Sequence, residues 1–70
     1  GPLELSDLVG LDVRKDILNN LAESFSDDSY RPHPLLEELV KNGELGKKTN
    51  KGIYNWDNGT KSERDDLPFL

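Results

Sequence analysis

The chain has 70 residues with no cysteine and one histidine, so disulfide bonds and a four-ligand zinc site are excluded, and no metal site is predicted. Its net charge of −5 disfavours nucleic-acid binding, and no apolar run approaches the roughly 20 residues that span a bilayer, so we expect no membrane partner. Only 33% of the residues are hydrophobic, so this single small domain needs support from another chain or a further part of its own protein.

The first predicted element is a short helix over residues 5–9, and Gly10 stands where a left-handed C-terminal stop is expected. Asp12 is the expected N-cap of a second helix over residues 13–25. This helix has the strongest amphipathic pattern of the chain. Its apolar stripe consists of Val13, Ile17, Leu18, Leu21, Ala22 and Phe25.

Residues 26–34 are polar, contain two prolines and are expected to form a loop. Pro34 suits the first position of a third helix, which Gly43 would end. His33 lies between the two prolines, and we interpret it as a surface or capping residue. Residues 45–56 are broken by glycine and indicate a turn followed by an extended segment.

The composition changes sharply after Trp56. Residues 57–66 contain no apolar side chain, and residues 57–70 are therefore predicted to be a flexible tail or linker. Tyr54 and Trp56 are expected to pack on the helices. Three apolar residues near the end, Leu67, Phe69 and Leu70, would allow the tail to dock on a neighbouring chain.

Two motifs carry the most specific information. The first is Gly1-Pro2-Leu3-Glu4-Leu5-Ser6-Asp7-Leu8-Val9-Gly10-Leu11-Asp12, and the second is Gly43-Glu44-Leu45-Gly46-Lys47-Lys48-Thr49-Asn50-Lys51-Gly52-Ile53-Tyr54-Asn55. Their order and separation resemble the C-terminal domain of the 3-hydroxyacyl-CoA dehydrogenases over about residues 1–56. Because the family motif also opens with Gly-Pro, we interpret Gly1-Pro2 as native sequence rather than the remnant of a cleaved tag.

The resemblance implies an all-α fold of about three helices with a glycine-rich, hairpin-like C-terminal segment, similar to the C-terminal domain of 6-phosphogluconate dehydrogenase. Residues 1–56 would be part of a domain that closes over the acyl-CoA substrate and forms the contact of a homodimer. NAD would bind to a Rossmann domain of the same protein that is missing here, since the chain has no G-x-G-x-x-G fingerprint. The parent enzyme would act in cytoplasmic fatty-acid β-oxidation.

The second motif predicts a tight structural turn built from Gly43, Gly46, Asn50 and Gly52. The family usually has Gly where Asn50 stands, and asparagine is the best non-glycine residue for a positive φ angle. An alternative interpretation makes Lys47, Lys48 and Lys51 a basic lip near the CoA tail.

Five residues are candidates for substrate binding through the resemblance: Gly1, Pro2, Asp7, Lys47 and Lys48. Asp7 is also a candidate for a capping or pairing role within the fold. No catalytic or cofactor-binding residue is predicted, and this chain alone is expected to be inactive and to bind no cofactor. Two other classes stay open: a non-catalytic helical interaction module, and part of a multifunctional β-oxidation protein fused to an enoyl-CoA hydratase.

Overall fold

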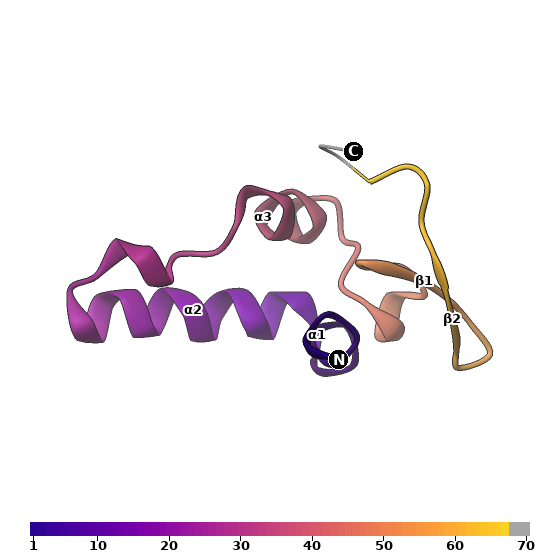
Figure 1. Ribbon diagram of the computed structural model, residues 1–70, viewed down its shortest axis with the longest axis horizontal. Helices are drawn as coiled ribbons and strands as arrows, with labels where there is room; N and C mark the ends of the chain where they lie inside the picture. Colours follow the sequence, from indigo (N-terminus) through magenta and orange to yellow (C-terminus); the bar gives the residue numbers. More distant parts are fainter. Residues whose placement is uncertain (68–70) are drawn as a thin grey trace.

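The computed structural model describes residues 1–67, so the proposed docking of Phe69 and Leu70 lies outside the described residues. Three α-helices are followed by a small two-stranded sheet (Figure 1). In chain order the elements are α1 (Pro2–Val9), α2 (Leu11–Phe25), the 3-10 helix η1 (Asp28–Tyr30), α3 (Pro34–Lys41), the 3-10 helix η2 (Lys47–Thr49), β1 (Tyr54–Asp57) and β2 (Thr60–Glu63). The predicted helical fold with a hairpin-like end is confirmed.

The first two helices begin earlier than predicted. Pro2 occupies the first turn of α1, where its fixed φ angle suits a helix and its missing N–H is not needed. Asp12 is not the N-cap of α2, because Gly10 takes that position. The helix starts at Leu11, whose N–H donates to the carbonyl of Leu45 at 2.8 Å. A distant backbone acceptor therefore replaces the expected side-chain cap.

The third helix follows the prediction closely. Pro34 lies in its first turn, and His33 is the N-cap, with a ring nitrogen that accepts a hydrogen bond from the Leu35 N–H at 3.0 Å. The capping interpretation of His33 is thus confirmed. Gly43 follows the C-cap Asn42 with a φ angle of 74°, so the helix ends as expected.

Helix α2 lies along the long axis of the molecule, while α1 and α3 run across it (Figure 1). The hairpin lies beside α1, away from the C-terminal end of α2. Four hydrophobic side chains among the described residues are fully or almost fully buried: Leu11, Ala22, Leu39 and Trp56. This small core joins both ends of the chain. No helix within residues 1–67 has the length and apolar character needed to cross a membrane.

The sheet corrects the expected tail. β1 and β2 pair antiparallel, with Trp56 opposite Lys61 and Asp57 opposite Thr60. Asn58 and Gly59 form the two-residue turn, with φ angles of 50° and 79°, as a type I′ turn requires. Residues 57–63 of the flexible tail predicted over residues 57–70 therefore belong to a regular hairpin, which corrects that prediction for this part of the chain. Backbone pairing with β1 and the chemistry of the turn order β2, which has no apolar side chain of its own.

Candidate functional site

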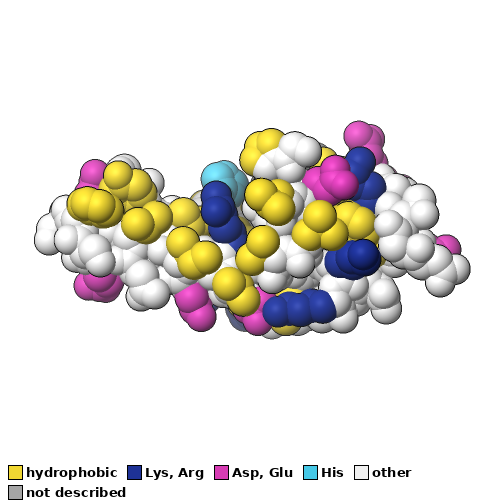
Figure 2. Space-filling view, turned by 90° about the horizontal axis from the view of Figure 1, so that it is seen from below, with side chains coloured by type: hydrophobic (Ala, Val, Ile, Leu, Met, Phe, Trp, Pro, Cys, Tyr) yellow, Lys and Arg dark blue, Asp and Glu magenta, His cyan; other side chains and the backbone are white. Residues whose placement is uncertain are grey.

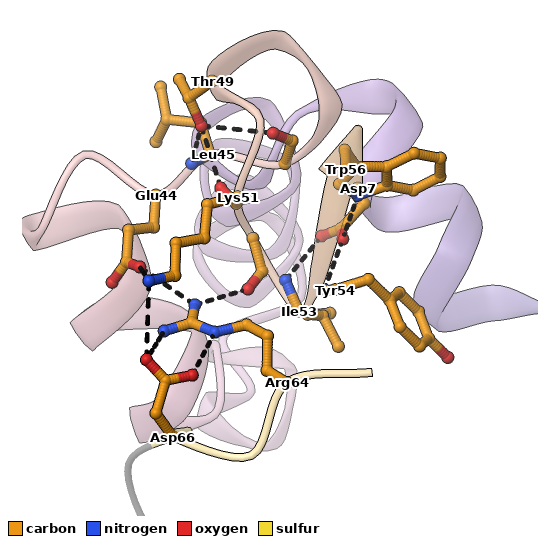
Figure 3. Close-up of polar contacts among 12 residues, drawn as sticks. Asp7, Glu44, Leu45, Thr49, Lys51, Ile53, Tyr54, Trp56, Arg64 and Asp66 are labelled. Carbon is orange, nitrogen blue, oxygen red and sulfur yellow. Dashed lines mark hydrogen bonds and ion pairs between the residues drawn. The ribbon is translucent and has the colours of Figure 1, made fainter. Parts of the chain in front are cut away.

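The two sequence motifs meet at the carboxylate of Asp7, which projects from α1 and has no solvent exposure. Its Oδ1 accepts a hydrogen bond from the Ile53 N–H, and its Oδ2 accepts from the Tyr54 N–H and the indole Nε1–H of Trp56, all at 2.9 Å (Figure 3). Three N–H groups thus replace the water that a buried carboxylate loses. Asp7 binds the start of the chain to the second motif, 46 or more residues away.

The second motif folds as a closed turn before it reaches Asp7. Gly46 and Lys51 exchange two backbone hydrogen bonds, of 2.9 and 3.1 Å, around η2. The Thr49 hydroxyl accepts from the Leu45 N–H at 2.9 Å and lies within bonding distance of the Lys51 carbonyl. Asn50 has a φ angle of 64°, so the predicted left-handed conformation is confirmed. Its carbonyl then accepts from the Trp56 N–H at 3.0 Å, which directs the chain into β1.

Two glycines of this motif are required by close backbone approach. A Cβ atom at Gly46 would lie 2.3 Å from the carbonyl oxygen of Asp7. A Cβ atom at Gly52 would lie 2.5 Å from the Asp7 Oδ1 and 2.5 Å from the Gly46 Cα. Any side chain at either position would therefore separate the motifs. The structural interpretation of these glycines is consistent with this geometry.

A second link joins the turn to α2. The ammonium of Lys48 lies 2.8 Å from Oδ1 of Asp12, close enough for an ion pair although that oxygen has no hydrogen bond of good geometry. The ammonium of Lys48 holds the pKa of Asp12 below its usual value. Both side chains are about half exposed, so the pair contributes little to stability. It brings Lys48 of the basic segment next to the first turn of α2.

Arg64 forms a third link that the sequence analysis missed. Its side chain is 3% exposed and donates to the Gly52 carbonyl at 2.8 Å. It also pairs with Glu44 at 3.0 Å and with Asp66 at 3.0 and 3.3 Å (Figure 3). The bond from Arg64 lowers the pKa of Asp66 to about 2. Lys51 completes the cluster at 3.8 Å from Glu44 and 3.5 Å from Asp66. The cluster fastens the end of the hairpin onto the turn.

One signal for the hairpin was present in the sequence. Asn58-Gly59 is the dipeptide that type I′ turns favour, and it stands between two segments that could pair. No comparable signal marks Arg64, because a lone arginine in an acidic stretch is typical of a solvated segment. Its burial depends on the Gly52 carbonyl and Glu44, which only the folded chain brings near.

The candidate substrate-binding residues fall into two groups. Asp7 and Lys48 are engaged by partners within the chain, so the interior position of Asp7 does not fit direct substrate contact. Gly1, Pro2 and Lys47 lie on the surface, where their proposed role stays a prediction. Lys51 is held by carboxylates, which leaves the predicted basic lip largely neutralised. In the described range no cluster of three or more His, Cys, Asp or Glu is placed to hold a metal ion.

This arrangement is a rigid junction. The Asp7 carboxylate receives three N–H donors and faces no solvent, so its geometry suits holding two motifs together. A proton-transfer role would require contact with a reacting group, which an enclosed carboxylate cannot make. The Asp7 carboxylate thus has a structural role, which is to hold α1 against the second motif.

Comparison with known proteins finds a family whose members match the segment that holds both motifs. Residues 1–56 match the family described as "3-hydroxyacyl-CoA dehydrogenase, C-terminal domain". The 3-hydroxybutyryl-CoA dehydrogenase of Mycobacterium tuberculosis is 50% identical over 56 residues, which are 80% of this chain and 20% of that protein. The chain therefore spans about a fifth of the length of such relatives.

Solved structures agree with this match. The crystal structure of M. tuberculosis FadB2 aligns with a TM-score of 0.78 and 49% identity, over 81% of this chain and 20% of that one. The Escherichia coli 3-hydroxybutyryl-CoA dehydrogenase aligns with a TM-score of 0.77 and 37% identity, over 100% of this chain and 14% of that one. The chain belongs to the family of the 3-hydroxyacyl-CoA dehydrogenase C-terminal domain.

Proposed function

We propose that this chain is a working part of an NAD-dependent dehydrogenase that oxidises a 3-hydroxyacyl-CoA to the 3-oxoacyl-CoA. The observation that carries the proposal is the Asp7 junction, which joins the two motifs of the dehydrogenase C-terminal domain through three hydrogen bonds. The sequence is also 50% identical over 56 residues to a 3-hydroxybutyryl-CoA dehydrogenase, which supports the same class of reaction for the parent protein.

In this proposal NAD and the reacting groups belong to the rest of the enzyme. The chain has no glycine-rich dinucleotide fingerprint, and the residues at its centre are used for internal contacts. Its part is to shape the helical domain that closes over the acyl-CoA. We place the parent enzyme in the cytoplasm, in fatty-acid β-oxidation, and the absence of cysteine is compatible with a reducing compartment.

The parent is further proposed to form a homodimer through this domain. Several large apolar side chains of α1 and α2 are about half exposed, which is unusual for a surface meant to face water. They are Leu3, Leu5, Leu8, Val9, Val13 and Ile17. Figure 2 shows hydrophobic side chains gathered on the face in view, with basic side chains among them. Covering such a surface with a second subunit would supply the support that a small core lacks.

A chimera tests this function. Residues 1–56 of this chain would replace the matching segment of the M. tuberculosis 3-hydroxybutyryl-CoA dehydrogenase, with a deletion of that segment as the control. We expect the chimera to reduce NAD with 3-hydroxybutyryl-CoA, while the deletion is inactive. A chimera that is folded and dimeric but has no activity would contradict the proposal and favour a non-catalytic interaction module.

A further inference from the structure

An open apolar groove lies between the three helices, and no side chain of the described residues fills it. Its volume is about 320 Å³, and α1, α2, α3 and the start of the hairpin segment all contribute to its walls. The apolar lining consists of Leu3, Leu18, Leu35, Leu36, Leu39 and Ile53. Only Leu39 of these is fully buried, so the remaining side chains keep contact with water that a covering element would remove.

Two of the three polar side chains along this groove have a hydrogen free to donate. Arg14 lines it from α2, and His33 lines it from the start of α3. One ring nitrogen of His33 already accepts a bond from the Leu35 N–H, so in the neutral ring the other nitrogen carries the hydrogen. Ser6 also lines the groove, but its hydroxyl hydrogen is already donated to the Pro2 carbonyl, so the free donors are those of Arg14 and His33. The groove therefore favours an occupant that brings hydrogen-bond acceptors.

Arg14 has the central position. Besides this groove it borders a second, smaller hollow on the α1–α2 side, lined by Pro2, Leu5, Ser6, Val9 and Ile17. Of the three arginines in residues 1–67, Arg31 and Arg64 form ion pairs, whereas Arg14 is in none of the ion pairs of the described residues. The Arg14 guanidinium lies between two apolar hollows, and its charge costs little free energy while it is exposed to water. Any element that covers the groove also covers this charge, and a buried charge without a partner is strongly unfavourable.

We infer that the groove is the docking site of an apolar helical face that places an Asp or Glu carboxylate against Arg14, and that this helix belongs to the remaining part of the dehydrogenase. The inference rests on the proposed function, since the chain spans only about a fifth of its relatives. A helix fits because apolar side chains three and four residues apart can enter a groove between helices, with the acidic residue in the same stripe.

A second copy of this chain is a poorer occupant. Two copies related by a two-fold axis, groove against groove, would bring their Arg14 side chains toward each other. Like charges that are covered together repel, and this chain has no carboxylate positioned to separate them in the described groove lining. An acidic helix from elsewhere in the enzyme meets the requirement directly.

The test uses two synthetic amphipathic helical peptides of about 18 residues. They share one leucine stripe and differ by a single Glu or Lys at its centre. Binding of each labelled peptide to the whole chain would be followed by fluorescence anisotropy. We expect the Glu peptide to bind at least about tenfold more tightly, and Arg14→Gln to abolish that preference. Arg14→Glu should reverse it, so that the Lys peptide binds better.

Matched variants locate the effect. Lys15→Gln removes a neighbouring positive charge on the same helix, but Lys15 lines a different, polar hollow with Glu37 and Glu38, so the preference should persist. Leu36→Ser should weaken binding, whereas Phe25→Ser, at an exposed apolar residue at the end of α2 and outside the groove lining, should not. Equal binding of both peptides, or a preference that survives Arg14→Gln, would overturn the inference. Because no enzymatic activity is measured, such a failure would leave the dehydrogenase proposal standing, and an inactive chimera would leave this binding result standing.

Discussion

Replacing Asp7 by Asn removes the charge at the junction while keeping the shape of the side chain. In the native chain two carboxylate oxygens receive three N–H donors. An amide has one oxygen and one NH₂ group, so the NH₂ must face at least one of these donors. Asp7→Asn therefore leaves a buried N–H without an acceptor and weakens the bonds that remain.

The cost follows from the number of bonds lost. Hydrogen bonds to a charged group contribute about 1.5–3 kcal/mol each, and a buried unsatisfied donor costs about 1–3 kcal/mol. We expect the free energy of unfolding to fall by about 2–4 kcal/mol for Asp7→Asn. A domain of this size is stable by only about 4–10 kcal/mol, so Asp7→Ala, which leaves all three donors unpaired, should largely unfold the chain.

Urea unfolding followed by tryptophan fluorescence measures this loss. Trp56 is the sole tryptophan, and its indole is one of the donors to Asp7, so the probe reports on the junction itself. Asp16→Asn is the matched control, because Asp16 is an exposed acidic residue of α2 and its replacement should be almost neutral. If Asp7→Asn changes the midpoint no more than this control does, the junction does not hold the fold together and the reasoning is wrong.

Three further predictions concern the turn and the hairpin. Asn50→Gly should be neutral or stabilising and Asn50→Val should cost about 1–2 kcal/mol, because a β-branched residue is strained at a φ angle of 64°; equal melting temperatures would refute this. The pKa of Asp66 is lowered to about 2, so its stabilising effect should be complete above its ordinary value of 3.8 and be lost as the pH falls from there through 2. The melting temperature of Asp66→Asn should match that of the native chain below pH 2 and be lower at pH 7, and a difference that is independent of pH would count against the pairing with Arg64. Truncation after Asp57 removes β2 and Arg64, so it should lower the melting temperature by several degrees, whereas an unchanged value would support the tail that the composition indicated.

The helices could be predicted because local rules determine them. The amphipathic stripe of α2, Pro34 at the start of α3 and Gly43 after its end are signals carried by neighbouring residues. The start of α2 was misplaced because its first N–H bonds to the Leu45 carbonyl, a partner that sequence spacing does not indicate. Local propensity therefore identified the elements but not the contacts that set their ends.

The site was predictable only in part for the same reason. The positive φ angle of Asn50 could be predicted because asparagine stands at a position where the family usually has glycine. The role of Asp7 needs three donors that lie 46 to 49 residues away. Arg64 was overlooked because the sequence segment around it, residues 57–66, contains no apolar residue. Its position is determined instead by charge-assisted bonds to Gly52, Glu44 and Asp66.

The chimeric dehydrogenase also offers the most direct test of the central claim, that this chain shapes the acyl-CoA side of the enzyme and not the NAD side. KM would be measured separately for NAD and for 3-hydroxybutyryl-CoA, in the chimera and in the unaltered M. tuberculosis enzyme. We predict that the KM for NAD stays within about twofold and that any change falls on kcat and on the KM for the acyl-CoA. A chimera whose KM for NAD rises tenfold or more while its KM for the acyl-CoA is unchanged would contradict the claim.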